Sequence, residues 1–185
     1  MGGRPNREFA APPEGMEKMM KRTYTFAIYL AMVLATLLAI PGLVAARTEA
    51  APVSRDQYVK IVIDRGMAQV GVPYSWAGGD INGPTLGKDT GATTVGFDSS
   101  GLIQYVYAGV GAKLPRSSGD MYQVGQKVTP AQALPGNLIF YGPNGTQSVA
   151  MFLGNNQMLE VTDTAVAVSP VRTKDMAPYL IRVIA

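Results

Sequence analysis

The sequence of 185 residues contains no cysteine and no histidine. Without cysteine there can be no disulfide, no thiolate metal site and no thiol nucleophile. Without histidine the chain also lacks the side chain that most often serves as a general base or a metal ligand. We therefore expect neither a cofactor nor a metal site, and any catalysis would need a different base.

The chain also has little charge of either sign. Its 16 Lys and Arg residues against 13 Asp and Glu give a net charge of +3, and charged residues make up only 16% of the sequence. A nearly neutral chain without a basic stripe is a poor candidate for binding nucleic acid, so we expect no nucleic-acid partner. The length leaves room for one domain with its own core and for appendages.

The N-terminal part divides by composition into three segments. Residues 1–17 are rich in Pro, Gly and charge, and we expect a disordered or untranslated extension. Residues 18–46 place basic residues before an apolar run that ends in small residues, which is typical of a secretory signal peptide. An uncleaved membrane anchor is the alternative. We expect cleavage near Ala46, no stable membrane insertion afterwards, and a short linker over residues 47–53.

Residues 54–185 are expected to form one domain, which begins with two helices. Ser54 and Gln57 have the spacing of a capping box, and the apolar positions that follow predict a helix that Gly71 ends. A second helix is expected to begin within residues 98–100, whose side chains can cap its first turn. Between the helices, residues 77–96 are dense in Gly, Asp, Asn and Thr, which predicts a long surface loop beside that helix start.

The C-terminal third is predicted to be β-structure. An Asn-Gly pair at positions 144–145 signals a turn between the first two strands. Helices followed by antiparallel strands indicate an α+β domain in which the helices pack on one face of an antiparallel sheet. The expected strands are residues 137–141, 148–153, 157–162, 165–169 and 179–184.

Five stretches, in order along the chain, resemble motifs of the NlpC/P60 peptidoglycan hydrolases. Residues 71–79, GVPYSWAGG, are similar to G-x-P-Y-x-W-G-G, and residues 97–101, FDSSG, to D-C-S-G. Residues 114–118, LPRSS, are similar to L-P-R-[ST]-[ST], residues 134–140, LPGNLIF, to P-G-D-L-x-F, and residues 148–154, SVAMFLG, to H-V-G-I-Y-x-G. The pattern most resembles a non-catalytic mycobacterial branch that binds peptidoglycan. The resemblance implies a papain-like core.

The resemblance places side chains that cannot perform the family's chemistry at its nucleophile and base positions. Ser99 stands where the family has its nucleophilic cysteine, Ser148 where it has the basic histidine, and Glu160 where a third residue orients that histidine. An alcohol is a far weaker acid than a thiol and needs an adjacent base. We therefore expect no enzymatic activity. The open alternative is an endopeptidase in which Ser99 attacks with Glu160, Lys88 or Lys113 as base.

Binding of a ligand does not need the catalytic residues. The resemblance implies a cleft in which aromatic platforms, Asp98 for an amine and Arg116 for a carboxylate suit a peptidoglycan stem peptide. Each residue also has a structural interpretation, such as a helix cap for Asp98 or a core aromatic for Trp76. The candidate ligand-binding residues are Tyr74, Trp76, Asp98, Ser99, Ser100, Arg116, Ser117, Ser148 and Glu160.

These expectations describe a secreted protein of the cell wall or periplasmic space. Its expected function is to bind stem peptides without cleaving them, with peptidoglycan as the partner. The alternative to ligand binding is that the domain docks on active cell-wall hydrolases and leaves the cleft unused.

Overall fold

The computed structural model describes residues 53–185, so the predictions for residues 1–52 lie outside the described part. The described chain begins with helix α2 (Arg55–Met67). Ser54 Oγ accepts a hydrogen bond from Gln57 N at 3.3 Å, and Ser54 N donates to Gln57 Oε1 at 2.7 Å. The predicted capping box is thus confirmed. The helix ends a turn before Gly71, which has a positive φ of 91° in the following turn.

Helix α3 (Ser99–Ala108) begins where the sequence predicts it. Asp98 is its N-cap, and its Oδ1 accepts a hydrogen bond from Gly101 N at 2.7 Å. The helix buries Leu102, Ile103 and Val106 completely, as their spacing implies. One face of α3 is therefore fixed against the core, and its N-terminal end remains at the surface.

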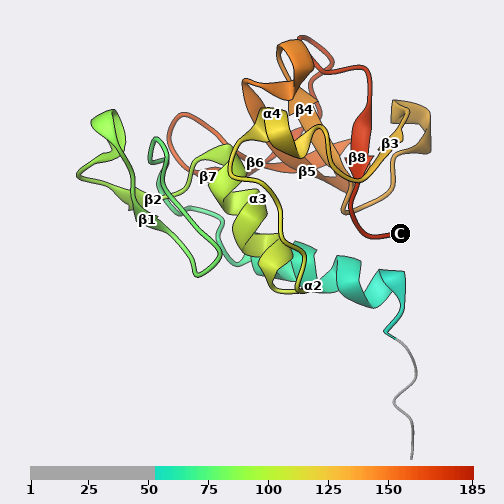
Figure 1. Ribbon diagram of the computed structural model, residues 1–185, viewed down its shortest axis with the longest axis horizontal. Helices are drawn as coiled ribbons and strands as arrows, with labels where there is room; N and C mark the ends of the chain where they lie inside the picture. The colour runs from blue at the N-terminus through green and yellow to red at the C-terminus, as the bar shows by residue number, and fades with distance from the viewer. Residues whose placement is uncertain (1–52) are drawn as a thin grey trace, which may run out of the picture. The chain divides into compact units, whose positions relative to one another are not determined.

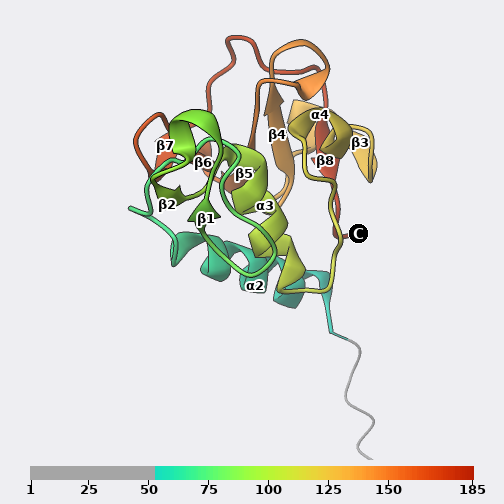
Figure 2. The same cartoon turned by 60° about the vertical axis from the view of Figure 1, so that its left-hand side comes forward.

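A six-stranded antiparallel sheet forms the second layer, in the order β3-β8-β4-β5-β6-β7. Figures 1 and 2 show α2 and α3 together on one side of this sheet, which confirms the predicted α+β class. All five predicted strands are present, shifted by one or two residues at their ends. The strands are β3 (Gln126–Val128), β4 (Leu138–Tyr141), β5 (Ser148–Gly154), β6 (Gln157–Val161), β7 (Val166–Pro170) and β8 (Leu180–Arg182).

Smaller elements complete the fold. The segment between the long helices contains a two-stranded antiparallel sheet, β1 (Thr85–Leu86) with β2 (Val95–Gly96), around the 3-10 turn η1 (Asp89–Gly91). The short helix α4 (Ser118–Met121) follows α3. The 3-10 turn η2 (Pro130–Gln132) follows β3, and η3 (Pro143–Gly145) lies in the predicted β4–β5 connection. Within residues 53–185, no helix has the length and hydropathy to cross a bilayer.

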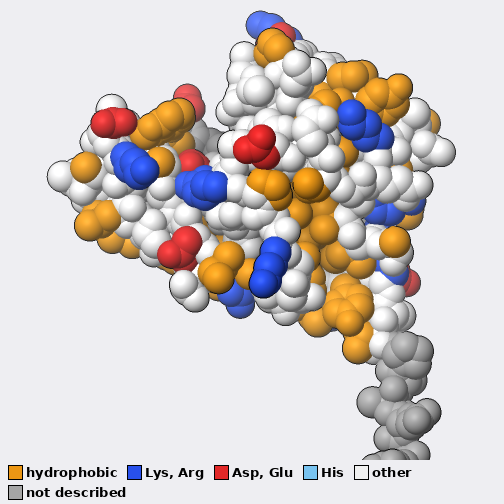
Figure 3. Space-filling model, in the orientation of Figure 1, with side chains coloured by type: hydrophobic (Ala, Val, Ile, Leu, Met, Phe, Trp, Pro, Cys, Tyr) orange, Lys and Arg blue, Asp and Glu red, His pale blue; other side chains and the backbone are white. Residues whose placement is uncertain are grey.

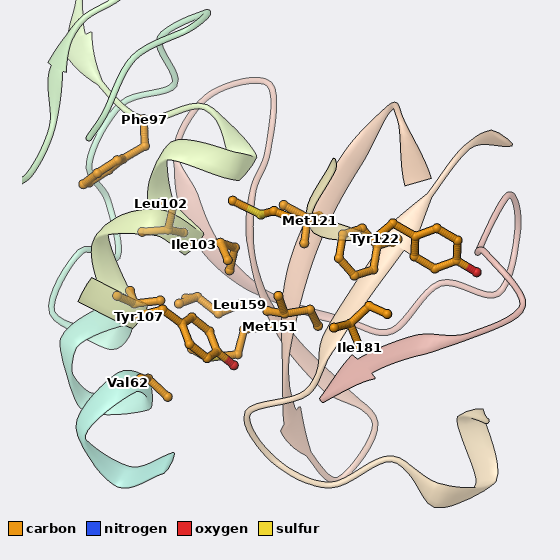
Figure 4. Close-up of a cluster of buried hydrophobic side chains, with 14 of the residues drawn as sticks. Val62, Phe97, Leu102, Ile103, Tyr107, Met121, Tyr122, Met151, Leu159 and Ile181 are labelled. Atoms are coloured by element: carbon orange, nitrogen blue, oxygen red, sulfur yellow. The ribbon is translucent and has the colours of Figure 1, made fainter. Parts of the chain in front are cut away.

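The main core lies between the helices and the sheet (Figure 4). Val62 from α2 and Tyr107 from α3 meet Met151 and Leu159 from the sheet, all with exposed fractions of 0%. Burying each of these side chains contributes on the order of 1.5–3 kcal/mol. The packing is close enough at α2 that a Cβ on Gly66 would lie 2.5 Å from the Leu159 side chain. This layer holds the start of α3 in a fixed position relative to β5.

Candidate functional site

A cleft of about 460 Å³ opens at the N-terminal end of α3. Residues 98–100, 116–118, 146–148 and 161–163 contribute to its walls. The remaining lining residues come from the segment before α3 and are Tyr74, Trp76, Ala77 and Lys88. Eight of the nine candidate ligand-binding residues line this cleft, and only Glu160 does not. Parts of the chain far apart in sequence therefore meet at one site.

Ser99 and Ser148 reach the cleft from two different layers. Ser99 is the first residue of α3 and Ser148 the first of β5, and both are partly buried. Within residues 53–185, neither hydroxyl makes a hydrogen bond to a carboxylate or an amine. The site therefore presents two hydroxyl groups without an engaged base.

Asp98 and Arg116 are paired with each other inside the cleft. Arg116 Nη1 lies 2.9 Å from Asp98 Oδ1, and Nη2 lies 2.8 Å from Oδ2, which is a bidentate ion pair. The guanidinium also donates to Ser100 Oγ at 2.7 Å and to the Gly78 carbonyl at 3.1 Å. The two residues predicted to receive charged ligand groups thus form one network with Ser100, and Asp98 has the capping role that was its structural interpretation.

The aromatic candidates differ in their surroundings. Trp76 has an exposed fraction of 53%, so it is a cleft residue and not a core aromatic. Tyr74 is partly buried, and burial, followed by the negative charges of Asp98 and Asp163, raises the pKa of its hydroxyl. Tyr74 therefore stays protonated and offers a hydrogen-bond donor to the cleft.

The glycine-rich segment 77–96 is folded tightly around Ser75. This serine has an exposed fraction of 1%, and its Oγ donates to the carbonyls of Gly91 at 3.1 Å and Thr94 at 2.7 Å. A Cβ at Gly87 would collide with the Trp76 carbonyl oxygen, which explains why glycine is needed there. The segment is compactly folded and contributes Ala77 and Lys88 to the cleft wall, which its composition alone does not reveal.

Glu160 is not among the residues that line the cleft, although its neighbour Val161 is. Its side chain is 9% exposed, and Oε1 lies 2.7 Å from Arg172 Nη1. Burial alone would raise the pKa of this carboxyl, but hydrogen bonds from Arg172 and Ser169, with the Arg172 charge, lower it overall. Arg172 also stacks over the Tyr141 ring. Sequence reasoning missed Arg172 because no motif contains it.

Ser117 caps the short helix α4. Its Oγ accepts a hydrogen bond from Asp120 N at 3.2 Å and donates to Asp120 Oδ2 at 2.7 Å.

Sequence reasoning also missed several cleft residues that lie outside the motifs, including Gln147 and Asp163. Among the described residues, no group of three or more acidic side chains is placed to hold a metal ion.

Comparison with known proteins gives the site its context. Residues 71–185 match the NlpC/P60 family. The peptidoglycan endopeptidase RipB of Mycobacterium tuberculosis is 55% identical over 130 residues, which cover 69% of this chain and 54% of the relative. The chain therefore corresponds to about half the length of that curated relative.

Two solved structures are informative neighbours. RipD from Mycobacterium tuberculosis, described as a non-catalytic NlpC/p60 domain protein adapted to a peptidoglycan-binding function, is 68% identical. The match has a TM-score of 0.67 and covers 69% of this chain and 98% of that one. A RipA structure mutated at a cysteine is 55% identical with a TM-score of 0.68, and covers 69% of this chain and 63% of that one.

The altered positions of RipA can be compared with Ser99, Ser148 and Glu160 here. RipA has been solved with mutations at a cysteine, at a histidine 49 positions later and at a glutamate 12 positions after that. Ser99, Ser148 and Glu160 are separated by the same 49 and 12 positions. With the motifs, the fold and the extent of the match in agreement, the chain belongs to the NlpC/P60 family.

Proposed function

We propose that this chain is a catalytically inactive NlpC/P60 domain that binds peptidoglycan stem peptides in its cleft. The observation that carries the proposal is the pair Ser99 and Ser148, two hydroxyl groups at the positions that match a cysteine and a histidine in RipA. The open cleft with its exposed Trp76 supports a continuing role in ligand binding. The likeness to RipD supports the same proposal.

The endopeptidase alternative is weaker on physical grounds. RipB and RipA are named peptidoglycan endopeptidases, so the family includes active members. A serine nucleophile needs a base within hydrogen-bond reach. In the described part of the chain, Glu160 is hydrogen-bonded to Arg172, and neither Glu160 nor Lys113 lines the cleft. Lys88 lines the cleft but makes no hydrogen bond to Ser99 within residues 53–185.

The test is retention of the purified protein on insoluble cell walls, combined with an assay for released peptide fragments. We expect the wild-type protein to sediment with the walls and to release no fragments. We expect Trp76→Ala to weaken binding by about fivefold or more, because an exposed aromatic in a cleft is a typical binding hot spot.

Ile81→Ala is the matched control, since Ile81 is 56% exposed and does not line the cleft. Equal retention of Trp76→Ala and wild type would contradict a ligand in this cleft. Fragments released by the wild type would instead support the endopeptidase alternative. If the wild-type protein does not bind cell walls but binds a purified cell-wall hydrolase, the result would support the docking alternative.

We also propose that the domain acts outside the cytoplasm, in the cell wall or periplasmic space. The order of basic, apolar and small residues over positions 18–46 supports export. We expect mass spectrometry of the protein from the cell envelope and culture medium to find a mature chain that begins near Arg47. A mature chain that keeps the apolar run at positions 26–40 would show an anchor instead.

A further inference from the structure

The charged side chains that line the cleft are either paired with each other or without an ion-pair partner among the described residues. Four charged side chains contribute to its walls: Lys88, Asp98, Arg116 and Asp163. Asp98 and Arg116 neutralise each other in a bidentate pair that also caps α3. Lys88 and Asp163 have no ion-pair partner within the described residues. A ligand therefore meets one available positive charge and one available negative charge.

Both of these residues belong to segments held in place by backbone hydrogen bonds. Lys88 N donates to the Trp76 carbonyl at 2.8 Å, which ties the lysine to one aromatic residue. Asp163 lies in the turn between β6 and β7, where the Thr164 carbonyl accepts a hydrogen bond from Tyr74 N at 2.9 Å. The backbone of Lys88 is thus fixed to that of Trp76, and the turn that contains Asp163 is fixed to the backbone of Tyr74.

The rest of the surface offers no stronger candidate for a site that selects a ligand. On the face in Figure 3, Lys and Arg side chains are interspersed with Asp and Glu and form no patch of one sign. An apolar pocket of about 240 Å³ on the opposite face of the sheet, lined by Ile139 and Phe152 among others, has no feature that identifies an occupant. The cleft charges are therefore the observation with the clearest chemical meaning.

We propose that Lys88 and Asp163 are the specificity-determining contacts of the cleft, and that they select a peptide segment with both a free carboxylate and a free ammonium group. Lys88 receives the carboxylate and Asp163 receives the ammonium. This inference rests on the proposed stem-peptide function and deepens it. It assigns charge selection to two residues outside the family motifs, while Asp98 and Arg116 serve mainly to hold the cleft together.

Binding the same ligand groups through Asp98 and Arg116 would cost more free energy, because these two residues are already paired with each other. A ligand carboxylate that bound Arg116 would have to compete with Asp98, Ser100 and the Gly78 carbonyl for the same guanidinium. A ligand ammonium at Asp98 would compete with that guanidinium and with the helix cap. Lys88 and Asp163 exchange only water for a ligand, so pairing with them costs less reorganisation.

The experiment compares soluble stem peptides released from purified cell walls in three forms: unmodified, acetylated at the free amine, and amidated at the free carboxylate. Binding is measured by titration calorimetry with wild type, Lys88→Gln and Asp163→Asn. Matched controls are Lys113→Gln and Asp175→Asn, which remove the same charges from exposed residues that do not line the cleft.

We expect each cleft variant to weaken binding of the unmodified peptide by about fivefold, the size of one partly solvated charge pair. Acetylation should weaken wild-type binding by a similar factor and have no further effect on Asp163→Asn. Amidation should behave in the same way toward Lys88→Gln. Acetylation should further weaken binding to Lys88→Gln, and amidation should further weaken binding to Asp163→Asn. In these two combinations the modification and the substitution remove different contacts, so their effects on the binding free energy should add.

Cleft variants that bind like the controls, or modifications whose effects persist in the matching variant, would overturn the assignment of Lys88 and Asp163. In that case wild-type binding to cell walls would still stand, and the proposed function with it. If the wild type binds neither walls nor soluble peptides, both the proposed function and this inference fail.

Discussion

A chain that carries both Ser99→Cys and Ser148→His is expected to release peptide fragments slowly from purified peptidoglycan, whereas the unmodified protein releases none. Ser99 is the first residue of α3, where the partial positive charge of a helix start lowers the pKa of a thiol. An imidazole at position 148 would reach the same cleft from the start of β5. The pair would thus supply a nucleophile and a base that the natural chain lacks.

The expected rate is low for a reason that the structure provides. Glu160, the residue expected to orient the histidine, is held by Arg172 and does not line the cleft. Ala150 and Asn137 also depart from the residues usual in the family motifs. Misplacement of a catalytic group by about 1 Å can cost about a hundredfold in rate. We therefore expect activity that is detectable but far below that of an active endopeptidase.

The measurement is chromatography and mass spectrometry of soluble fragments after prolonged incubation with walls. The single variants Ser99→Cys and Ser148→His serve as controls and are expected to be inactive, because each supplies only one of the two groups. No release by the double variant would contradict the prediction that the cleft has kept a usable geometry. Hydrolysis by the unmodified protein that Ser99→Ala abolishes would contradict the inactive-domain proposal itself.

Sequence patterns predicted those parts of the fold that depend on local physics. The capping box at Ser54 and the Asp98 cap of α3 follow from side chains within three residues of their acceptors. The five main strands follow from apolar and β-branched runs between turn signals. Strand β3 escaped prediction because its three residues include only one buried side chain, Val128, and so show no alternation.

The candidate site was predictable only at the level of motif positions. Eight side chains named from the motifs line one cleft, but their pairing depends on contacts between distant parts of the chain. Arg116 meets Asp98 across 18 positions in sequence, and Arg172 meets Glu160 across 12. A linear pattern contains no information on which of several polar side chains a guanidinium will contact. The compact folding of residues 77–96 around Ser75 could not be predicted for the same reason, because it depends on contacts between residues 16 and 19 positions apart.

Asn137, a departure from the family motif, leaves an unfavourable arrangement in the core. The residue has an exposed fraction of 1%, and its Oδ1 accepts a hydrogen bond from Leu134 N at 3.0 Å and lies 3.5 Å from Arg182 Nη2. Within residues 53–185, Asn137 Nδ2 and Arg182 Nε are buried donors that lack an acceptor. Arg182 has no acidic partner in this part of the chain either. A carboxylate at position 137 would remove the unpaired Nδ2 donor and place a negative charge near the Arg182 guanidinium.

We therefore expect Asn137→Asp to stabilise the domain by about 1–3 kcal/mol, the usual cost of a buried polar group without a partner. The substitution replaces a donor with a second acceptor oxygen and places a negative charge beside the partly buried Arg182. Burying a carboxylate is itself costly, but here it would be paired and hydrogen-bonded to Leu134 N. The measurement is urea unfolding at neutral pH, with the midpoint rising at an unchanged slope.

Two comparisons identify the cause of this gain. Asn144→Asp is the matched control, because it adds the same charge at an exposed turn residue and is expected to leave stability within about 0.5 kcal/mol. In an Arg182→Gln background, Asn137→Asp should no longer stabilise, since the buried carboxylate has lost its cation. The gain should also shrink as the pH falls and the carboxyl group becomes protonated. An equal gain with and without Arg182, or a loss of stability at neutral pH, would contradict the explanation.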